Sequence, residues 1–126
     1  MNDSDTTLAE LRKLVTEFRD RREWARLHTP KNLSMAIAVE AAELMEHFQW
    51  LAQNEAWELA EDSGPRRLMG EELADVLIYG LSFAEALQLD VATAVVDKLA
   101  RNAKKYPEDD DLGRPSWLER VKGDDA

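Results

Sequence analysis

Apolar residues recur at three- and four-residue steps through most of this chain, and this spacing limits its fold more than any other feature. No segment shows the residue-by-residue alternation of apolar and polar side chains that is typical of a half-buried strand. Pro30 and the turn Ser63-Gly64-Pro65 separate the first three periodic segments, and a fourth begins at Asp90. The spacing predicts an all-α fold with helices at about residues 6–26, 33–51, 66–87 and 90–106. Between them, residues 52–64 are predicted to be a mobile connection with one helical turn near Ala56.

The charge balance and residue content argue against several classes of function. The 26 acidic and 16 basic residues give a formal net charge of -10, which opposes attraction to nucleic acid or to an anionic membrane. The chain has no cysteine, so disulfides, a thiolate nucleophile and a cysteine zinc site are excluded. Residues 1–14 lack the order of a secretory signal, and residues 76–89 are too short and too polar to span a bilayer. We therefore expect a cytoplasmic protein without nucleic-acid or membrane partners.

The length of 126 residues fits one domain, expected at residues 1–107. A chain of this size can bury a core, but it has few residues left to enclose a pocket as well. We therefore expect a homo-oligomer. Residues 108–126 are acidic and rich in turn-forming residues, which is typical of a flexible tail. Trp117 in this tail and Trp57 are interpreted as residues that cover the core or an interface.

Two pairs of acidic residues are each spaced three positions apart, Glu40 with Glu43 and Glu72 with Asp75. On helices, the members of each pair share a face beside the apolar stripe. Carboxylates that border a core repel one another and lose solvation unless they are protonated, ion-paired or bound to a metal. Oxygen ligands favour Mg²⁺, with Mn²⁺ as a substitute. The two pairs together predict a divalent-metal site, whereas one such pair is usually only a solvated helix face.

The other acidic residues and the histidines allow alternative interpretations. Glu46 and Glu71 are interpreted as acids that point away from the apolar stripe, and Glu85 as an acid that forms an ion pair on the surface. His47 is interpreted as a packed or half-exposed histidine. A carboxylate-bridged di-iron bundle calls for Glu-x-x-His pairs, which the sequence lacks. No glycine-rich phosphate loop or Ser-His-Asp set supports covalent catalysis. A non-enzymatic interaction bundle, whose acids only keep its surface soluble, stays open as an alternative.

The acid pairs are part of a longer set of matching residues. The set comprises Glu23-Trp24, His28-x-Pro30-Lys31-Asn32-Leu33, Glu43-Leu44, Phe48-Gln49-Trp50, Glu72-Leu73-x-Asp75-Val76-Leu77-Ile78-Tyr79, Lys98, Asn102 and Lys105-Tyr106-Pro107. With these residues the chain resembles the MazG-like all-α nucleoside triphosphate pyrophosphohydrolases, and within them the dCTP pyrophosphatase branch. The resemblance covers roughly residues 8–107.

The resemblance implies a four-helix MazG-like bundle assembled as a homo-oligomer, either a dimer or a tetramer. It implies Mg²⁺-dependent conversion of a nucleoside triphosphate, expected to be dCTP or a modified dCTP, to the monophosphate and pyrophosphate. The biological role would be cleansing of the nucleotide pool. Hydrolysis of a broad range of triphosphates, or of one with another base, stays open. In mammalian members the position of Val15 is a histidine that contacts the nucleotide, so this difference bears on base preference.

Residue roles also follow from the resemblance. The metal ligands would be Glu40, Glu43, Glu72 and Asp75. The substrate contacts would be Trp24 and Trp50 on the base, His28 and Tyr79 on the nucleotide, and Lys98 and Asn102 on phosphate or sugar. Glu43 and Glu72 are the predicted catalytic acids, because each combines metal ligation with the capacity to accept a proton from the attacking water.

The spacing of Trp50 gives that residue a further argument. It follows Glu43 by seven residues, which is about 10 Å along a continuous helix. This length is close to the distance from a metal-bound phosphate to its base, and a flat indole suits stacking on a nucleobase. We therefore expect Trp50 to lie on the same helix face as the acids.

Overall fold

The computed structural model describes residues 1–108 of the chain, and over these residues it is helical without any strand. The helices are α1 (Leu8–Arg21), α2 (Pro30–Glu46), α3 (Gln53–Glu61), α4 (Ser63–Leu87) and α5 (Val91–Lys105), with the 3₁₀ turn η1 (Ala25–Leu27) between α1 and α2. The prediction of an all-α fold is confirmed. The predicted tail, residues 108–126 with Trp117, lies outside the described residues apart from Glu108.

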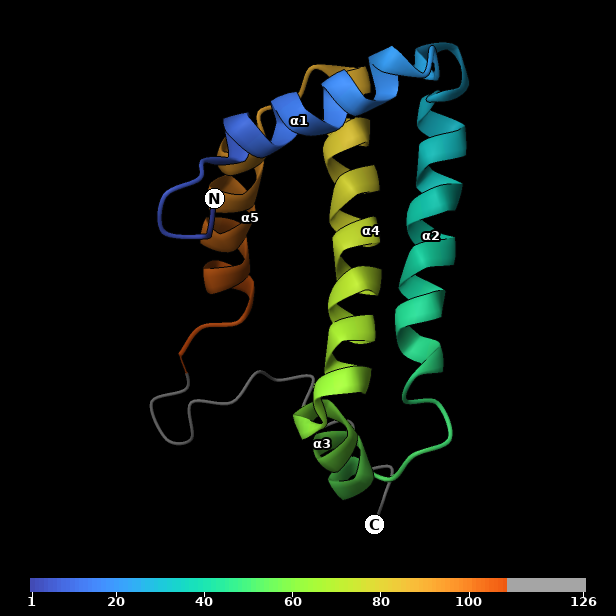
Figure 1. Ribbon diagram of the computed structural model, residues 1–126. Helices are drawn as coiled ribbons and strands as arrows, with labels where there is room; N and C mark the ends of the chain where they lie inside the picture. Colours follow the sequence, from blue (N-terminus) through green and yellow to red (C-terminus); the bar gives the residue numbers. More distant parts are fainter. Residues whose placement is uncertain (109–126) are drawn as a thin grey trace. The chain divides into compact units, whose positions relative to one another are not determined.

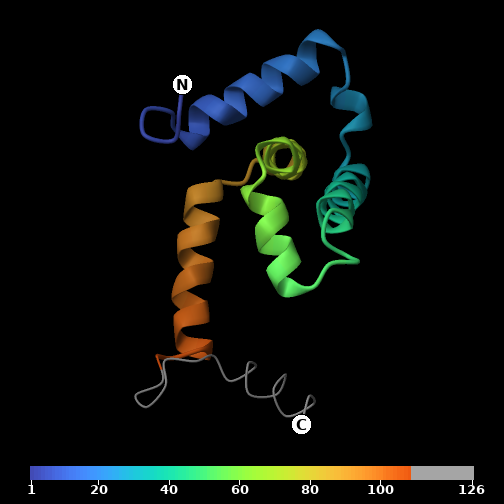
Figure 2. The ribbon, with the colours of Figure 1, turned by 60° about the horizontal axis from the view of Figure 1, so that its bottom comes forward.

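The chain divides into two units, residues 1–89 and residues 90–126, and each is described by itself. In the first unit α2 and α4 run antiparallel side by side, and α1 and α3 also contact α4 (Figures 1 and 2). The second unit contributes α5. No single helix within residues 1–108 is long and apolar enough to cross a membrane. The pair α4 and α5 has the required length and composition only when the two helices are counted together.

Side-chain caps fix where the helices of the first unit begin. Thr7 and Glu10 form a capping box at α1, with the Glu10 N–H donating to Thr7 Oγ1 at 3.2 Å and the Thr7 N–H donating to Glu10 Oε2 at 2.6 Å. Thr29 caps α2 through the Asn32 N–H at 3.2 Å, and Pro30 occupies the first turn, where its missing N–H costs no hydrogen bond. The caps therefore supply partners for N–H groups that a helix start leaves free.

The end of α1 differs from the predicted boundary. The helix stops at Arg21 instead of residue 26, because Glu23 adopts a left-handed backbone angle, φ 56°. The Glu23 N–H donates to Asp20 O at 3.0 Å and the Trp24 N–H donates to Arg19 O at 3.2 Å. This pattern resembles the Schellman motif that closes many helices. The turn reverses the chain, so that Trp24 comes back beside the last turns of α1.

The predicted end of the second helix is wrong, and the helical turn predicted near Ala56 belongs to a longer helix. α2 ends at Glu46 and not near residue 51, since tight turns follow in which Phe48 N–H donates to Met45 O at 2.9 Å and Leu51 N–H donates to Phe48 O at 3.0 Å. The expected mobile connection contains the nine-residue helix α3. Its start is stabilised by Glu55, whose carboxylate accepts from the Ala52 N–H at 2.9 Å. Residues with high helix propensity continue α3. The helix is too short for its apolar spacing to be recognised in the sequence.

The buried core of the first unit lies where the start of α2 meets the end of α4. The buried residues described are Leu33, which is 1% exposed, and Leu81, Ser82 and Ala84. The Ser82 hydroxyl donates to Ile78 O at 2.9 Å, so its burial leaves no unsatisfied donor. The acids Glu40, Glu43 and Glu72 therefore lie farther along the same helix pair, beyond this core.

A guanidinium ties α1 to the last turn of α4. Arg12 Nε lies 2.6 Å from Glu85 Oε2, and other nitrogens of the same group donate to Ala84 O at 3.0 Å and to Leu89 O. Glu85 thus pairs as predicted, but the pair is only about a quarter exposed. The hydrogen bond from Arg12 lowers the pKa of the Glu85 carboxyl. This contact therefore stabilises the folded state at pH values above the ordinary pKa of a glutamate. The contact fixes α1 across the end of α4.

Candidate functional site

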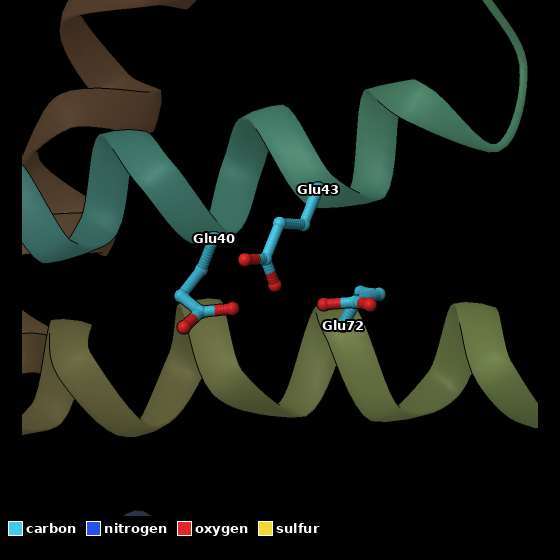
Figure 3. Close-up of side chains that lie close together, drawn as sticks. All are labelled: Glu40, Glu43 and Glu72. Atoms are coloured by element: carbon cyan, nitrogen blue, oxygen red, sulfur yellow. The ribbon is translucent and has the colours of Figure 1, made fainter.

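Three of the predicted acids converge between α2 and α4. Glu40 and Glu43 lie one turn apart on α2 and extend toward α4, from which Glu72 reaches up between the two helices (Figure 3). One carboxylate oxygen of each residue lies within 4.8 Å of the others. Oxygen ligands of Mg²⁺ or Ca²⁺ lie about 2.0–2.6 Å from the ion, so donors that share one ion are at most about 5 Å apart. We call Glu40, Glu43 and Glu72 the acid cluster.

Glu40 carries the clearest electrostatic signal in the cluster. Desolvation, together with the hydrogen bond and charge of Glu43 and the charges of Asp75 and Glu72, raises the pKa of Glu40 to about 7. Its Oε2 atom is buried and has no hydrogen-bond partner. A buried oxygen without a partner is unfavourable, and a bound cation removes both this cost and the repulsion. The donor set therefore fits a divalent cation that prefers oxygen.

Asp75 and His47 border the acid cluster. Asp75 is not among the three mutually close donors, but it lies near enough that its charge acts on Glu40 and Glu72. Desolvation and Glu43 raise the pKa of Glu72, whereas His47 acts in the opposite direction. His47 Nε2 lies 3.8 Å from Glu72 Oε1. The sequence interpretation of His47 as a packed histidine missed this contact, although its place four residues after Glu43 was a signal for it.

A chain of rings brings together three of the predicted nucleotide contacts. The ring centroids of Trp24 and His28 are 6.4 Å apart, and those of His28 and Tyr79 are also 6.4 Å apart. Burial, with the charge of Arg19 adding to it, lowers the pKa of His28, so the neutral ring is favoured. His28 Nδ1 is buried without a hydrogen-bond partner. The rings are tilted to one another by 43° and 58°, and the group, which we call the ring group, has one polar atom without a partner, His28 Nδ1.

Sequence reasoning missed two residues that support this group of rings. Phe18 meets Trp24 edge to face at a centroid distance of 5.9 Å. Arg22 places its guanidinium 3.5 Å from the centroid of the Phe18 ring and donates to Phe18 O at 2.9 Å. Such a cation–π contact restricts both side chains. The spacing of four between the two residues on one helix was the available signal.

The remaining predicted contacts are placed differently. Trp50 lies in the turns after α2 and is 88% exposed, so the expectation that it continues the helix face of the acids is wrong. The physical reason is that α2 ends four residues earlier, at Glu46. Lys98 and Asn102 lie on α5, in the second unit. Their contacts with phosphate or sugar stay predictions.

The comparison with protein families bears directly on this arrangement. The model of the MazG-like family matches residues 35–120, a range that contains the acid cluster and Asp75. The chain belongs to the MazG-like family. The predicted resemblance is therefore confirmed.

Relatives and a solved structure place this MazG-like chain more closely. It is 38% identical to dCTP pyrophosphatase 1 of Mus musculus over 103 residues, and 37% identical to dCTP pyrophosphatase 1 of Homo sapiens over 103 residues. Each match covers 82% of this chain and 61% of the relative, so the chain spans about three-fifths of the length of these proteins. A crystal structure of a pyrophosphatase from Archaeoglobus fulgidus is 39% identical, with a TM-score of 0.74, and the match covers 85% of this chain and 98% of that one.

Proposed function

We propose that this MazG-like protein is a Mg²⁺-dependent nucleoside triphosphate pyrophosphohydrolase whose substrate is dCTP or a modified dCTP. The observation that carries the proposal is the acid cluster, with its buried oxygen of Glu40 that has no hydrogen-bond partner. The names of the curated relatives and of the solved pyrophosphatase support the same reaction class. The products would be the monophosphate and pyrophosphate, and the role would be cleansing of the nucleotide pool.

Each acid has a role in this proposal. Glu40, Glu43, Glu72 and Asp75 would hold the divalent cation, with Mn²⁺ as a substitute for Mg²⁺. The bound cation would offset the negative charge of the triphosphate and polarise the phosphorus under attack. Glu43 and Glu72 are the candidate bases, because a carboxylate within reach of the attacking water orients it and accepts its proton. The reaction would cleave between the α- and β-phosphates.

The ring group is the proposed site of the nucleoside. α4 is continuous from Glu72 to Tyr79, a rise of seven residues or about 10 Å on one helix face. This is close to the distance between a metal-bound phosphate and its base. Trp24 and Tyr79 would contact the base and sugar through their rings, and His28 Nδ1 would gain the hydrogen-bond partner that it lacks. Trp50, Lys98 and Asn102 stay proposed contacts from the resemblance.

The proposal also includes a homo-oligomer, a dimer or a tetramer. Met35 and Val39 on α2 are 59% and 56% exposed, and Leu73 and Leu77 on α4 are 49% and 57% exposed. The members of each pair are four residues apart, so each helix carries an uncovered apolar stripe. A single chain buries few side chains among its described residues. A second copy that covered these stripes would bury more apolar surface.

Leu77→Lys is expected to lower the assembly state by placing a charge on the stripe of α4. Wild-type protein should elute as a dimer or tetramer in size-exclusion chromatography with light scattering, and the variant as a smaller species. Gln53→Lys, at the exposed start of α3, is the matched control and should leave the mass unchanged. A wild-type mass of one chain at micromolar concentration would contradict the oligomer.

Incubation with single nucleotides tests the reaction itself. With Mg²⁺ and dCTP, chromatography should detect dCMP and pyrophosphate, and with EDTA it should detect neither. Separate incubations with dUTP, dTTP, dATP and dGTP test the broad-range alternative. Release of orthophosphate and dCDP would contradict cleavage between the α- and β-phosphates, and no hydrolysis of any nucleotide would favour the non-enzymatic bundle.

A further inference from the structure

His47 is the residue next to the acid cluster to which neither the sequence nor the proposed function gives a role. It follows the last residue of α2 with helical backbone angles, φ -60° and ψ -24°. Because it lies four positions after Glu43, its side chain lies on the same helix face. Its Nε2 atom is 3.8 Å from Glu72 Oε1, and the two side chains are 23% and 24% exposed. His47 therefore spans from α2 to a carboxylate of α4.

We propose that His47 is a positioning residue for the metal centre, which holds the Glu72 carboxylate in the orientation that a divalent cation requires. The inference rests on the proposed function, because Glu72 needs a fixed orientation only if it binds a metal. Carboxylates that bind metals are commonly hydrogen-bonded by a second residue, and loss of that partner typically weakens metal binding about 10–100-fold. No other ion pair described within residues 1–108 involves a residue of the acid cluster.

The geometry favours positioning over direct metal ligation. The donors that lie mutually within 4.8 Å are Glu40, Glu43 and Glu72, and His47 is outside that set. The separation of 3.8 Å from Glu72 exceeds the usual N–H···O hydrogen bond of about 2.7–3.2 Å. Contacts of this kind tighten when a ligand fixes one partner, and small rotations of the two side chains are sufficient here. An imidazole also suits Mg²⁺ poorly as a ligand.

Neighbouring residues restrict the imidazole. The ring of Phe48 meets the His47 ring at a centroid distance of 6.4 Å and an interplanar angle of 65°. The backbone N–H of His47 donates to Met45 O, which keeps the residue in the last turn of α2. These contacts reduce the rotations available to His47 before a metal binds. A residue that is already ordered can orient Glu72 at a small entropic cost.

Two substitutions separate positioning from packing. His47→Leu removes the polar atoms, whereas His47→Gln keeps an N–H donor at a similar reach. Glu46→Gln is the control, because Glu46 is the exposed neighbour in sequence. Mg²⁺ affinity is measured by isothermal titration calorimetry on the full chain, and kcat is measured at increasing Mg²⁺ concentration. Circular dichroism in Mg²⁺-free buffer checks that each variant keeps its helices.

The expected result is a 10–100-fold weaker Mg²⁺ affinity for His47→Leu, by analogy with other second partners of metal ligands. We expect His47→Gln to recover most of the affinity and excess Mg²⁺ to restore most of the kcat of His47→Leu. Affinity within about twofold of wild type in His47→Leu would overturn the inference while leaving the metal centre intact. Equal weakening in both variants would overturn it in favour of packing. Wild-type protein that binds no Mg²⁺ would overturn the proposed function together with this inference.

Discussion

Glu40→Gln is expected to lower the hydrolysis of dCTP at saturating Mg²⁺ by at least about 1,000-fold, which corresponds to about 4 kcal/mol of transition-state stabilisation. Glutamine keeps the shape of the side chain but removes the charge that would bind the cation. Glu43→Gln and Glu72→Gln, which change the other two residues of the acid cluster, should have effects of the same size. The measurement is the initial rate of pyrophosphate release, with circular dichroism to confirm helicity.

Glu71→Gln is the matched control for these substitutions. Glu71 precedes Glu72 in sequence, but it is exposed and pairs with Arg67 one turn earlier on α4. The rate of dCTP hydrolysis by Glu71→Gln should stay within about twofold of wild type, because an exposed ion pair of this kind contributes little to stability. Mg²⁺-dependent activity retained by two or more of the three cluster variants would contradict the assignment of the acids.

The second prediction is that metal-free protein becomes less stable as the pH rises from about 5 to 8, and that Mg²⁺ reverses the loss. The pKa of Glu40 in the folded state is raised to about 7, above its ordinary value of 4.5. The folded state therefore binds more protons than the unfolded state between these values, so stability falls with rising pH across this window. Glu72 is shifted in the same direction and adds to the effect.

Thermal unfolding at one protein concentration measures this linkage. Without metal, Tm should fall by about 3–5 °C across the window, because solvent screening of these partly exposed carboxyls reduces the linkage to roughly 1 kcal/mol. Mg²⁺ should raise Tm more at pH 8 than at pH 5, because protons compete with the cation for the same oxygens. Glu40→Gln should flatten the pH dependence of the metal-free protein and reduce the response to Mg²⁺. The lowered pKa of His28 acts in the opposite direction below pH 6.5, and it does so in both proteins. A pH dependence of Tm that Glu40→Gln leaves unchanged would therefore contradict the role of the acid cluster.

The parts of the fold that the sequence predicts are those that depend on local helix geometry. The apolar spacing predicts α2 and α4, and the three-residue spacing places Glu40 beside Glu43 on one face. Apolar stripes beside the acids require the two helices to pack, which brings Glu72 to the same place. Helix period therefore predicts that the acids of each pair share a face, and the packing of the two apolar stripes predicts that the pairs meet.

The parts that the sequence does not predict depend on helix ends and on contacts between helices. No proline or glycine marks the end of α2 at Glu46, so the apolar spacing alone predicts a helix that continues to Trp50. α3 depends on Glu55 capping its start, a contact that a weak apolar pattern conceals. The approach of His47 to Glu72 joins residues 25 positions apart and is set by how closely the helices pack. Local spacing places His47 on the helix face of Glu43, but it does not give the distance from His47 to Glu72 on the other helix.

Anomalous diffraction from crystals of this protein grown with Mn²⁺ tests directly whether the acid cluster binds a metal ion. Mn²⁺ is the natural probe because it shares the preference of Mg²⁺ for carboxylate oxygen. An anomalous peak is expected between α2 and α4, within ligand distance of Glu40, Glu43 and Glu72, and it should be lost in Glu40→Gln crystals. Ordered acids without a peak at saturating Mn²⁺, or a peak elsewhere that Glu40→Gln leaves unchanged, would contradict the claim that these acids form the metal centre.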